Sequence, residues 1–362
     1  MSLTAAQRRL REFAEAEADS SPLYAHVAAH AAGDDEIAGL LAAAPDPDPE
    51  LLFAVAHRLV QADPIHPVTR YYQTMGGFDG VDAETWPLLR TFLLERAATA
   101  GELIASRRVR GDDVARAAVL YPAIAAVAKQ AGGQIALLEV GCGAGLLLGL
   151  DRYGYRYQCD GGEQFTAGPA KASVGLHCAV TGGGFGKPAK KVTIGARIGL
   201  DADPIDAADE DELAWLEACV RGDQPERARQ LRAAAAAQRK WAPELIAGDI
   251  VDDLASAAAR LPPELPLVVM NSNVMGHLSE IRREAYLAAL ATLAGDHPLW
   301  WVSHEPYCDG LTQLLPGRSD LEPAASEPVA AVLSIGRWAG GEPAVEVLAT
   351  TDPAGQRMNW LG

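Results

Sequence analysis

Cysteine is scarce in this sequence, and no two cysteines have the spacing of a zinc site. Five occur in 362 residues, with no Cys-x-x-Cys pair. An odd number of scattered cysteines is typical of reduced thiols rather than of a disulfide framework. His26 and His30 have helical spacing, but no third histidine or acidic ligand accompanies them, so we expect no metal site. The cysteines are Cys142, Cys159, Cys178, Cys219 and Cys308.

Long apolar runs and an excess of positive charge are also missing. No run approaches the roughly 18 apolar residues of a membrane span, and residues 1–20 carry too many charges for the apolar core of a secretory signal. We therefore expect a cytoplasmic protein with no membrane partner. The formal net charge of −17 argues against nucleic acid as the main partner, because phosphate binding needs a basic face.

The remaining composition is that of an ordinary globular protein, in a chain long enough for about two domains. Hydrophobic residues make up 49% and charged residues 22% of the chain, enough to bury a large core. Residues 3 to about 130 have Ala and Leu at helical spacing, which predicts a helical N-terminal domain over residues 1–130. From Ile135 onward, short apolar strands alternate with helices, as in an open and mainly parallel sheet.

Residues 131–362 are therefore predicted to form an α/β domain: a doubly wound, mostly parallel sheet with a closing antiparallel hairpin. An inserted β-ribbon is predicted at about 152–191, because Tyr153–Cys159 and Val174–Val180 alternate as strands do. The other expected strands are Ile135–Val140, Val192–Leu200, Glu244–Ala247, Leu267–Asn271 and Leu299–Ser303, and the hairpin strands are Ala330–Gly336 and Val345–Thr350, separated by Gly340-Gly341. Helices are expected at Asp209–Val220, Gln224–Lys240, Val251–Arg260 and Ile281–Leu293.

The most informative segment is the apolar run Gln134–Val140 followed by Gly141, Gly143 and Gly145. It predicts a buried strand, a sharp turn and the start of a helix, an arrangement that opens many nucleotide-type cofactor sites. Glycine allows a positive φ or close approach of a ligand to the backbone. A tight turn without a ligand is the alternative interpretation.

The spacing of this turn restricts the ligand. A dinucleotide fingerprint needs a third glycine where Leu146 stands, and the Gly-Lys-Ser/Thr of a phosphate loop is absent. The segment Glu139-x-Gly141-Cys142-Gly143-x-Gly145 instead resembles the first motif of S-adenosylmethionine-dependent methyltransferases. That resemblance implies that the turn holds the amino-acid end of S-adenosylmethionine.

Acidic residues follow the next two strands of the parallel sheet. Ligands of open α/β sheets bind outside the carboxyl ends of the strands, and Asp201 is placed there to accept both hydroxyls of a ribose, although an N-cap or turn role is the alternative for Asp201 or Asp203. Asp160 and Glu163 are closer in sequence to the glycines and are the second choice for this role. Asp249 and Ile250 resemble the methyltransferase pattern in which an acid and its neighbouring amide contact adenine, although Asp249 equally suits a helix N-cap.

The fourth and fifth strands also end in polar residues. Asn271 and Asn273 stand where the methyl group lies in the related fold and would orient a nucleophile, although asparagines at strand ends are common turn formers. His277 and His304 are candidate general bases because imidazole titrates near neutral pH, and Glu305 completes the candidate catalytic set. Each of these three residues has a purely structural alternative.

Taken together, these segments resemble the bacterial domain-of-unknown-function family 2332. The resemblance implies a methyltransferase-type sheet with a helical N-terminal domain, and S-adenosylmethionine as cofactor, but it implies no substrate. Val109–Asp113 departs from the family pattern, so no shared role is inferred for that segment. The segments that carry the resemblance are Ser21–Tyr24, Leu137–Gly145, Asp151–Tyr155, Arg197–Pro204, Trp215-Leu216 and Gly248-Asp249.

Three functional hypotheses follow. The first is an S-adenosylmethionine-dependent methyltransferase that acts on a small molecule and releases S-adenosylhomocysteine. The second is a non-catalytic binding or regulatory protein that retains the fold, because no known acceptor signature follows the fourth strand. The third is another nucleotide-cofactor enzyme such as an oxidoreductase, against which Leu146 counts.

Overall fold

The chain forms two compact units. The computed structural model describes residues 2–44, 47–296, 298–322, 331–339, 342–352 and 354–362. The first unit contains Met1–Asp112 and Ala207–Arg232, and the second contains Asp113–Asp206 and Ala233–Gly362. None of the described helices has the length and apolar character needed to cross a membrane.

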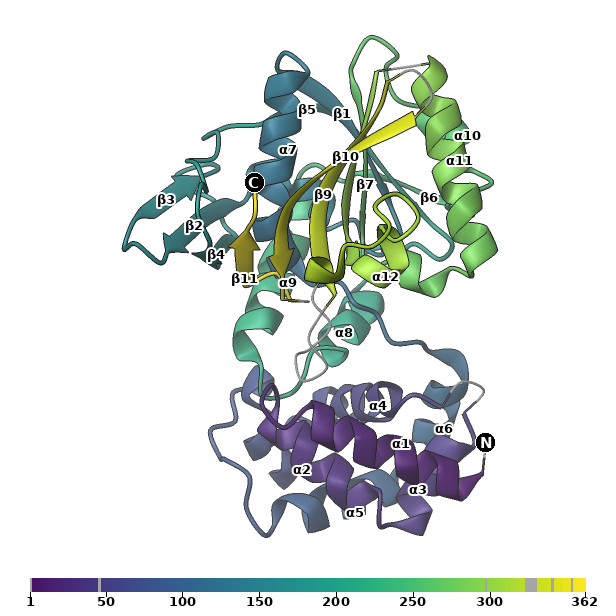
Figure 1. Ribbon diagram of the computed structural model, residues 1–362. Coiled ribbons are helices and arrows are strands. Elements are labelled where there is room, and N and C mark those ends of the chain that lie inside the picture. Colours follow the sequence, from purple (N-terminus) through teal and green to yellow (C-terminus); the bar gives the residue numbers. More distant parts are fainter. Residues whose placement is uncertain (1, 45–46, 297, 323–330, 340–341, 353) are drawn as a thin grey trace. The chain divides into compact units, whose positions relative to one another are not determined.

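The described part of the first unit consists of helices and their connections (Figure 1). Helix starts follow from side chains that accept hydrogen bonds from free amides: the Ser21 hydroxyl accepts from Tyr24 N, and Pro22 fills the first turn, where no amide hydrogen is needed. Asp34 caps the third helix in the same way. The helices are α1 (Leu3–Ala16), α2 (Pro22–Ala31), α3 (Asp35–Ala42), α4 (Pro49–Ala62), η1 (Pro67–Tyr71), η2 (Gln73–Met75), α5 (Thr85–Glu95), α6 (Ala97–Ser106) and α8 (Glu210–Ala218), while α9 (Pro225–Gln238) runs past the boundary at residue 232.

Polar contacts tie the segment 207–232 to helices far from it in sequence. The Asp223 carboxylate accepts hydrogen bonds from the Ser21 hydroxyl at 2.6 Å and from the Leu23 amide at 2.9 Å. Arg221 pairs with Glu17 at 2.6 Å and also with Glu50. The segment Ser21–Tyr24, which carries part of the family resemblance, therefore has a structural role within this unit.

The second unit is built on one mixed sheet, which confirms the predicted α/β class. Its described strands number eleven and run, from one edge to the other, β3 (Gln164–Ala167), β2 (Gly154–Cys159), β4 (Gly175–Thr181), β11 (Arg357–Trp360), β10 (Glu342–Thr351), β9 (Ala331–Ala339), β8 (Leu299–Pro306), β7 (Leu267–Ser272), β1 (Gln134–Val140), β5 (Thr193–Asp201) and β6 (Glu244–Ala247).

Five parallel strands form the part of the sheet that was predicted as its core. They lie in the order β6-β5-β1-β7-β8 and correspond closely to the predicted ranges. Continuous apolar runs identify such strands, because a strand that is covered on both faces has no polar alternation; all six residues of β7 are buried. The chain moves from β1 toward β5 and β6 on one side and later adds β7 and β8 on the other, so β1 and β7 flank a topological switch point.

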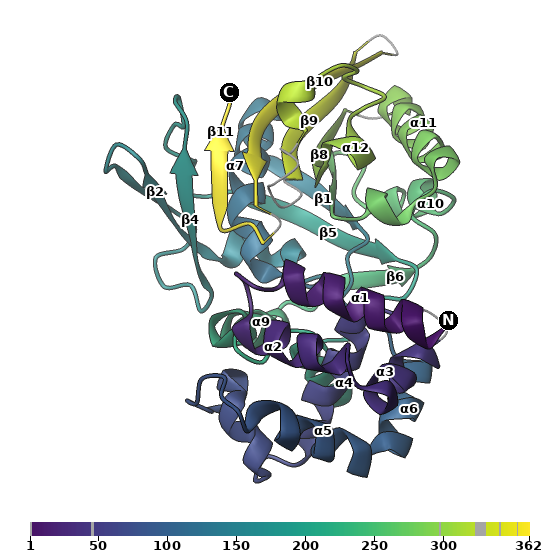
Figure 2. The same cartoon turned by 60° about the horizontal axis from the view of Figure 1, so that its bottom comes forward.

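Helices cover both faces of the parallel core of this sheet (Figure 1 and Figure 2). Successive residues of a strand point to opposite faces, and β8 shows what lies on each. The Trp300 Nε1 group donates to the Gln130 side chain of α7 (Ala117–Gln130) at 3.1 Å, whereas Trp301 belongs to the same buried apolar cluster as Tyr286 and Leu290 of α11 (Glu280–Asp296). The remaining helices of this unit are η3 (Val114–Arg116), η4 (Leu147–Arg152), α10 (Leu254–Ala258), η5 (Met275–His277), α12 (Tyr307–Gly310) and η6 (Ser319–Leu321).

The glycine turn does not open an α-helix, contrary to the sequence prediction. It leads into the six-residue 3₁₀ helix η4. Gly149 lies inside this segment, where a Cβ would come within 2.7 Å of the Trp241 ring, and the Tyr153 hydroxyl donates to the Leu146 carbonyl at 2.6 Å. The chain therefore enters β2 directly after this short helix.

The segment predicted as an inserted ribbon contains β2, β3 and β4, which are part of the main sheet. β2 and β4 pair in parallel, β3 pairs antiparallel with β2, and β4 pairs in parallel with β11. The alternating pattern arises because Tyr157 packs toward α7, where its hydroxyl donates to the Ala118 carbonyl at 2.9 Å, while Arg156 and Gln158 face solvent. β3 and β11 have only four residues each and were not predicted.

The closing hairpin is formed by β9 and β10, which pair antiparallel, and β9 lies antiparallel beside β8. Gly340-Gly341, predicted as the connection, and Ala330, predicted as the first hairpin residue, lie outside the described residues. The hairpin therefore adds an antiparallel strand directly next to the parallel core.

Candidate functional site

The glycine turn lies at the carboxyl end of β1, beside the switch point of the sheet. Gly141, Gly143 and Gly145 have φ values of 66°, 52° and 66°, a left-handed region that other residues rarely adopt. A Cβ on Gly145 would come within 2.7 Å of the Leu245 side chain, and one on Gly141 would overlap Val274. Backbone conformation and packing thus already require glycine at these positions.

Asp201, at the end of β5, is bound directly to this turn. One carboxylate oxygen accepts from the Gly143 amide at 2.8 Å, and the other accepts from the Asp203 amide at 2.8 Å. The Asp201 carbonyl also accepts from the Gly248 amide at 2.9 Å, which links the ends of β5 and β6. The structure therefore brings the preferred ribose candidate to the glycine turn.

The two other ribose candidates lie elsewhere. Asp160 and Glu163 are exposed on the turn that joins β2 to β3. These two strands form the edge of the sheet opposite to β6, with six described strands between β2 and β1. Neither carboxylate reaches the glycine turn.

Two predicted cofactor contacts have buried side chains. Glu139 on β1 is 3% exposed, and Cys142 in the turn is equally buried. The Cys142 thiol packs against β5, because a Cβ on Gly199 would lie 2.5 Å from its Sγ atom. A ligand at the turn would meet the backbone of residues 141–145 rather than these side chains.

Asp249 has the capping role that was its alternative interpretation. Its Oδ1 atom accepts from the amides of Val251 at 2.8 Å and Asp252 at 3.0 Å, and the carboxylate pairs with Arg282. Partial burial opposes ionisation, but these amides and the Arg282 charge lower the pKa of Asp249 below its usual value. The Ile250 side chain is buried in the core, while its amide donates no hydrogen bond within the described part of the chain.

Asn271, at the end of β7, is fully buried and bound by protein groups on both sides. Its Nδ2 group donates to Glu305 Oε1 at 2.6 Å, and its Oδ1 atom accepts from the Tyr286 hydroxyl at 3.3 Å and from Trp301 Nε1. The side chain fixes β7 to its neighbours and is not open to a ligand.

Glu305, on β8, holds the loop that follows β7. Its carboxylate accepts from the amides of Val274 at 2.9 Å and Met275 at 3.2 Å. Burial raises the pKa of Glu305 to about 7, although the amides and Asn271 partly offset that effect. A carboxyl with this pKa changes its charge near neutral pH, yet it is completely buried.

His304 occupies the other face of β8 and is also completely buried. Its Nδ1 atom lies 2.8 Å from the Ser272 hydroxyl and its Nε2 atom 2.7 Å from the Thr351 hydroxyl. Burial first, and then the Arg116 charge, lower the pKa of His304 to about 3, so the ring is neutral at physiological pH. Arg116 itself donates to the Ser272 carbonyl at 2.8 Å.

Among the predicted residues at the ends of β7 and β8, Asn273 and His277 are exposed. Asn273 is the only described non-glycine residue with a positive φ, at 56°, and its amide donates to the His304 carbonyl at 3.0 Å. His277 ends the short helix η5. The structure thus separates an exposed pair from the buried set Asn271, His304 and Glu305.

The sequence interpretation missed Arg116, Ser272, Thr351 and Tyr286 as partners of these residues. The one available signal was Arg116, a lone charge within the apolar run Val114–Val119. A buried charge needs polar partners, so a single cation within an apolar run predicts that such partners surround it in the folded protein. Among the described residues, no group of three or more His, Cys, Asp or Glu side chains could hold a metal ion.

A comparison with protein families gives a match over residues 7–360, nearly the whole chain, to a family described as "Uncharacterized protein conserved in bacteria (DUF2332)". No curated protein matches the chain. The matched range includes the glycine turn, Asp201, Asp249 and the network around His304 and Glu305.

Proposed function

The chain belongs to the DUF2332 family of bacterial proteins, and from this premise we propose that its sheet unit binds S-adenosylmethionine and transfers the methyl group to a small molecule. The observation that carries the proposal is the left-handed glycine turn at the switch point, bound to the carboxylate at the end of the next strand. The strand order β6-β5-β1-β7-β8 with an antiparallel strand next to β8 supports a doubly wound sheet of the methyltransferase type.

The form of the turn favours a cofactor without phosphate. Pyrophosphate sites use the free amides and dipole of an α-helix N-terminus. Here the turn leads into a six-residue 3₁₀ helix, which offers a much weaker dipole. The amino-acid end of S-adenosylmethionine carries its own ammonium and carboxylate and needs only nearby backbone groups.

The proposed contacts follow the strand ends in order. The Asp201 oxygens each accept one amide hydrogen bond and retain lone pairs for the ribose hydroxyls. The Ile250 amide is the donor for the adenine edge, next to Asp249 as the capping acid. The buried side chains of Glu139 and Cys142 support the glycine turn and do not contact the cofactor in this proposal.

Methyl transfer from a sulfonium depends mainly on alignment of the acceptor. Asn273 and His277 have exposed side chains in the loop that follows β7. In this proposal Asn273 orients the methyl acceptor, and His277 acts as the base that deprotonates it. Glu305 and His304 are positioning residues in this proposal. Glu305 binds the amides of Val274 and Met275, and the His304 carbonyl binds the Asn273 amide, so together they fix the loop that presents the acceptor side.

A binding protein without catalysis is the second candidate. It is favoured by one specific observation: protein groups engage the polar atoms of Asn271 and His304 and the Glu305 carboxylate, so three of the predicted polar residues lack free functional groups. Cofactor binding without methylation of any member of a broad acceptor panel would support this candidate over the enzyme.

Substitution Asp201→Asn is expected to weaken S-adenosylhomocysteine binding by about tenfold to a hundredfold, because the ribose hydroxyls lose a charged hydrogen-bond acceptor. Isothermal titration calorimetry measures the effect for both S-adenosylmethionine and S-adenosylhomocysteine. Asn keeps one oxygen for the Gly143 amide, so the glycine turn should survive, whereas the hydrogen bond from the Asp203 amide is lost.

The matched control is Asp203→Asn, which removes the same charge from an exposed neighbour and should change affinity by about twofold or less. If the unaltered protein binds neither compound at about millimolar concentration, the cofactor proposal fails. Equal losses in the two variants would mean that Asp201 does not contact the ribose.

A further inference from the structure

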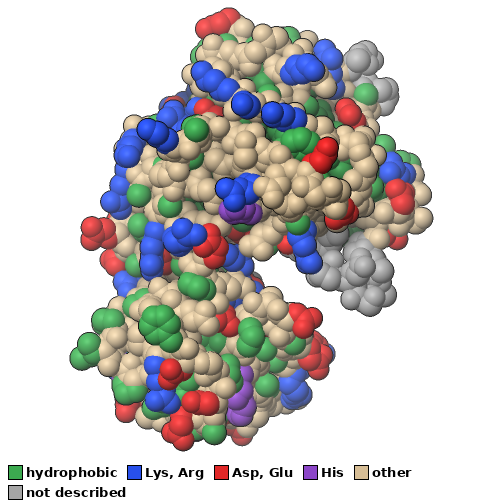
Figure 3. All heavy atoms as spheres, turned by 90° about the vertical axis from the view of Figure 1, so that its left-hand side faces the viewer, with side chains coloured by type: hydrophobic (Ala, Val, Ile, Leu, Met, Phe, Trp, Pro, Cys, Tyr) green, Lys and Arg blue, Asp and Glu red, His purple; other side chains and the backbone are tan. Residues whose placement is uncertain are grey.

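The cationic residues of this acidic chain are unevenly distributed. Four of its six lysines fall between residues 171 and 191, and residues 152–191 contain six Lys and Arg against two Asp and Glu, a local net charge of +4. These residues form β2, β3, β4 and their connections. Figure 3 views the molecule from the side of these strands and shows Lys and Arg side chains gathered on the face, with a histidine among them.

A pocket of about 440 Å³ lies on this part of the sheet, and its floor is a row of glycines. Gly154 pairs with Gly175 in the β2–β4 register, and a Cβ on Gly168 would lie 3.3 Å from the Gly154 Cα atom. Gly154 and Gly175 lie within strands, where glycine often marks close approach of a ligand, and a Cβ on Gly175 would meet no described atom within 4 Å. The volume falls within the range of small-molecule sites. We call it the ribbon pocket, lined by Gly154–Arg156, Thr166–Ala170, Ala172, Val174–His177 and Lys190.

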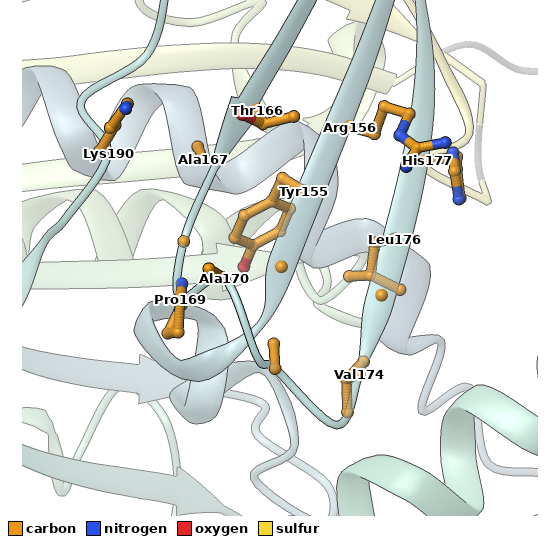
Figure 4. A pocket seen from close by; sticks show the side chains of 14 residues that line it. Tyr155, Arg156, Thr166, Ala167, Pro169, Ala170, Val174, Leu176, His177 and Lys190 are labelled. Atoms are coloured by element: carbon orange, nitrogen blue, oxygen red, sulfur yellow. The ribbon is translucent and has the colours of Figure 1, made fainter.

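Basic side chains and one hydroxyl stand beside this floor. Thr166 and His177 are the register partners of Arg156 in β3 and β4, so the three form a row across one face of the sheet. Lys190 is held near Gly168, whose amide donates to the Lys190 carbonyl at 3.0 Å. Figure 4 shows Lys190 on one side of Tyr155, and Arg156 with His177 on the other.

Nothing in the described structure balances these charges. Arg156, His177 and Lys190 make no side-chain hydrogen bond or ion pair within the described ranges, and no Asp or Glu lines the ribbon pocket. Most arginines of the chain do form such pairs, as Arg197 does with Asp151 at 2.7 Å. Unpaired basic groups around one hollow are the arrangement expected for an anionic ligand.

We infer that the ribbon pocket binds a small organic molecule through a phosphate group. A phosphate monoester carries close to two negative charges at neutral pH, so it can pair with both an arginine and a second cation. A carboxylate has only one charge and matches such a site less well. The apolar side chains of Ala170 and Ala172 on the remaining wall would contact the organic part. The site lies on the opposite edge of the sheet from β6, far along the sheet from the glycine turn, so it is independent of the proposed cofactor site.

Binding of phenyl phosphate tests this inference, with benzoate as the carboxylate analogue and inorganic phosphate as the anion without an organic part. We expect calorimetry to detect binding of phenyl phosphate at ligand concentrations up to about 10 mM. The affinity for benzoate should be lower by about tenfold or more. In NMR spectra of the unaltered protein, phenyl phosphate should shift the amide resonances of Gly154, Gly175 and His177. Inorganic phosphate should compete with phenyl phosphate for the same amides.

Matched substitutions separate the pocket from general surface charge. Arg156→Ala should weaken phenyl phosphate binding by about tenfold or more, whereas Arg357→Ala, an exposed arginine on β11 outside the pocket, should leave it within about twofold. Lys190→Ala and Lys187→Ala form a second such pair, since Lys187 does not line the pocket. Gly175→Ala adds a methyl group to the floor, with no described atom within 4 Å to oppose it, so it should weaken binding without unfolding the strand.

Several outcomes would overturn the inference. Absence of binding at about 10 mM, equal affinity for benzoate, or equal losses in the pocket and control variants would each contradict a phosphate pocket. A single-stranded RNA oligonucleotide is the remaining comparison. If it bound at physiological salt and Lys187→Ala weakened that binding as much as Lys190→Ala, the surface would be a nucleic-acid interface instead.

Discussion

Substitution Glu305→Ala is expected to lower the free energy of unfolding of the sheet unit by roughly 3 kcal/mol or more. The Glu305 carboxylate accepts hydrogen bonds from the amides of Val274 and Met275 and from the Asn271 side chain, all within a buried region. Alanine would leave three buried donors without an acceptor and a cavity in place of the carboxyl group. Urea unfolding followed by tryptophan fluorescence measures the loss, since Trp300 and Trp301 lie on the same strand.

Glu305→Gln provides the matched comparison, because it keeps the shape of the side chain and one acceptor oxygen. We expect it to cost clearly less than alanine at neutral pH. An unfolding midpoint for Glu305→Ala equal to that of the unaltered protein would contradict the assigned role. The same result would remove Glu305 as the residue that positions the loop carrying Asn273 and His277.

The raised pKa of Glu305 also predicts a pH dependence. Below about pH 4.5 the carboxyl is protonated in both states, but between about 4.5 and 7 the unfolded chain releases the proton while the folded protein retains it. The contribution of Glu305 to stability therefore decreases by roughly 3 kcal/mol as the pH rises through this window, and it is constant above it. Unfolding of Glu305→Gln lacks this change. The stability difference between the unaltered protein and Glu305→Gln should fall between pH 5 and pH 7, and a constant difference would show that the folded carboxyl has an ordinary pKa.

Substitution Gly168→Ala is expected to destabilise the β2–β4 region by roughly 2 kcal/mol or more. Gly168 has a φ of +75°, and its added Cβ would overlap the Tyr153 carbonyl and lie 3.0 Å from the Tyr153 carbonyl carbon. Both partners are backbone atoms, so no side-chain movement relieves the contact. Hydrogen exchange of the β2 and β4 amides would report the loss of protection directly.

Gly175→Ala, in the neighbouring strand, is the control for this prediction. No described atom lies within 4 Å of its added methyl group and its φ is not positive, so alanine should leave stability unchanged or raise it by about 0.5 kcal/mol. Equal protection of β2 and β4 in the two variants would contradict the requirement for glycine at residue 168. The pair compares the same chemical change at a closed and an open position.

The sequence predicts the parallel core well, because each strand is a continuous apolar run that periodicity can identify. It does not predict β3 and β11, whose four residues are too short for a pattern, or the parallel pairing of β4 with β11. Such pairing depends on contacts between residues about 180 positions apart, such as Val180 and Met358. Local sequence contains no signal for it.

The candidate site was predictable to the same extent. The glycine turn and Asp201 meet, because strand ends of a parallel sheet lie at one edge. The polar residues after β7 and β8 were harder to interpret, since a sequence does not show which of them are already bound by other protein groups. His304 looks like a general base until Ser272 and Thr351 are seen at its two nitrogens.

The position of β11 has a consequence for the order in which the protein folds during synthesis. The strand joins β4 to β10, so residues 154–181 have no link to the rest of the sheet on that side until residues 357–360 have been made. At about 5–20 residues per second, the ribosome needs roughly 10 to 35 s to reach them. During that interval the edge of β4 is an unpaired strand edge, open to chaperones or to another nascent chain.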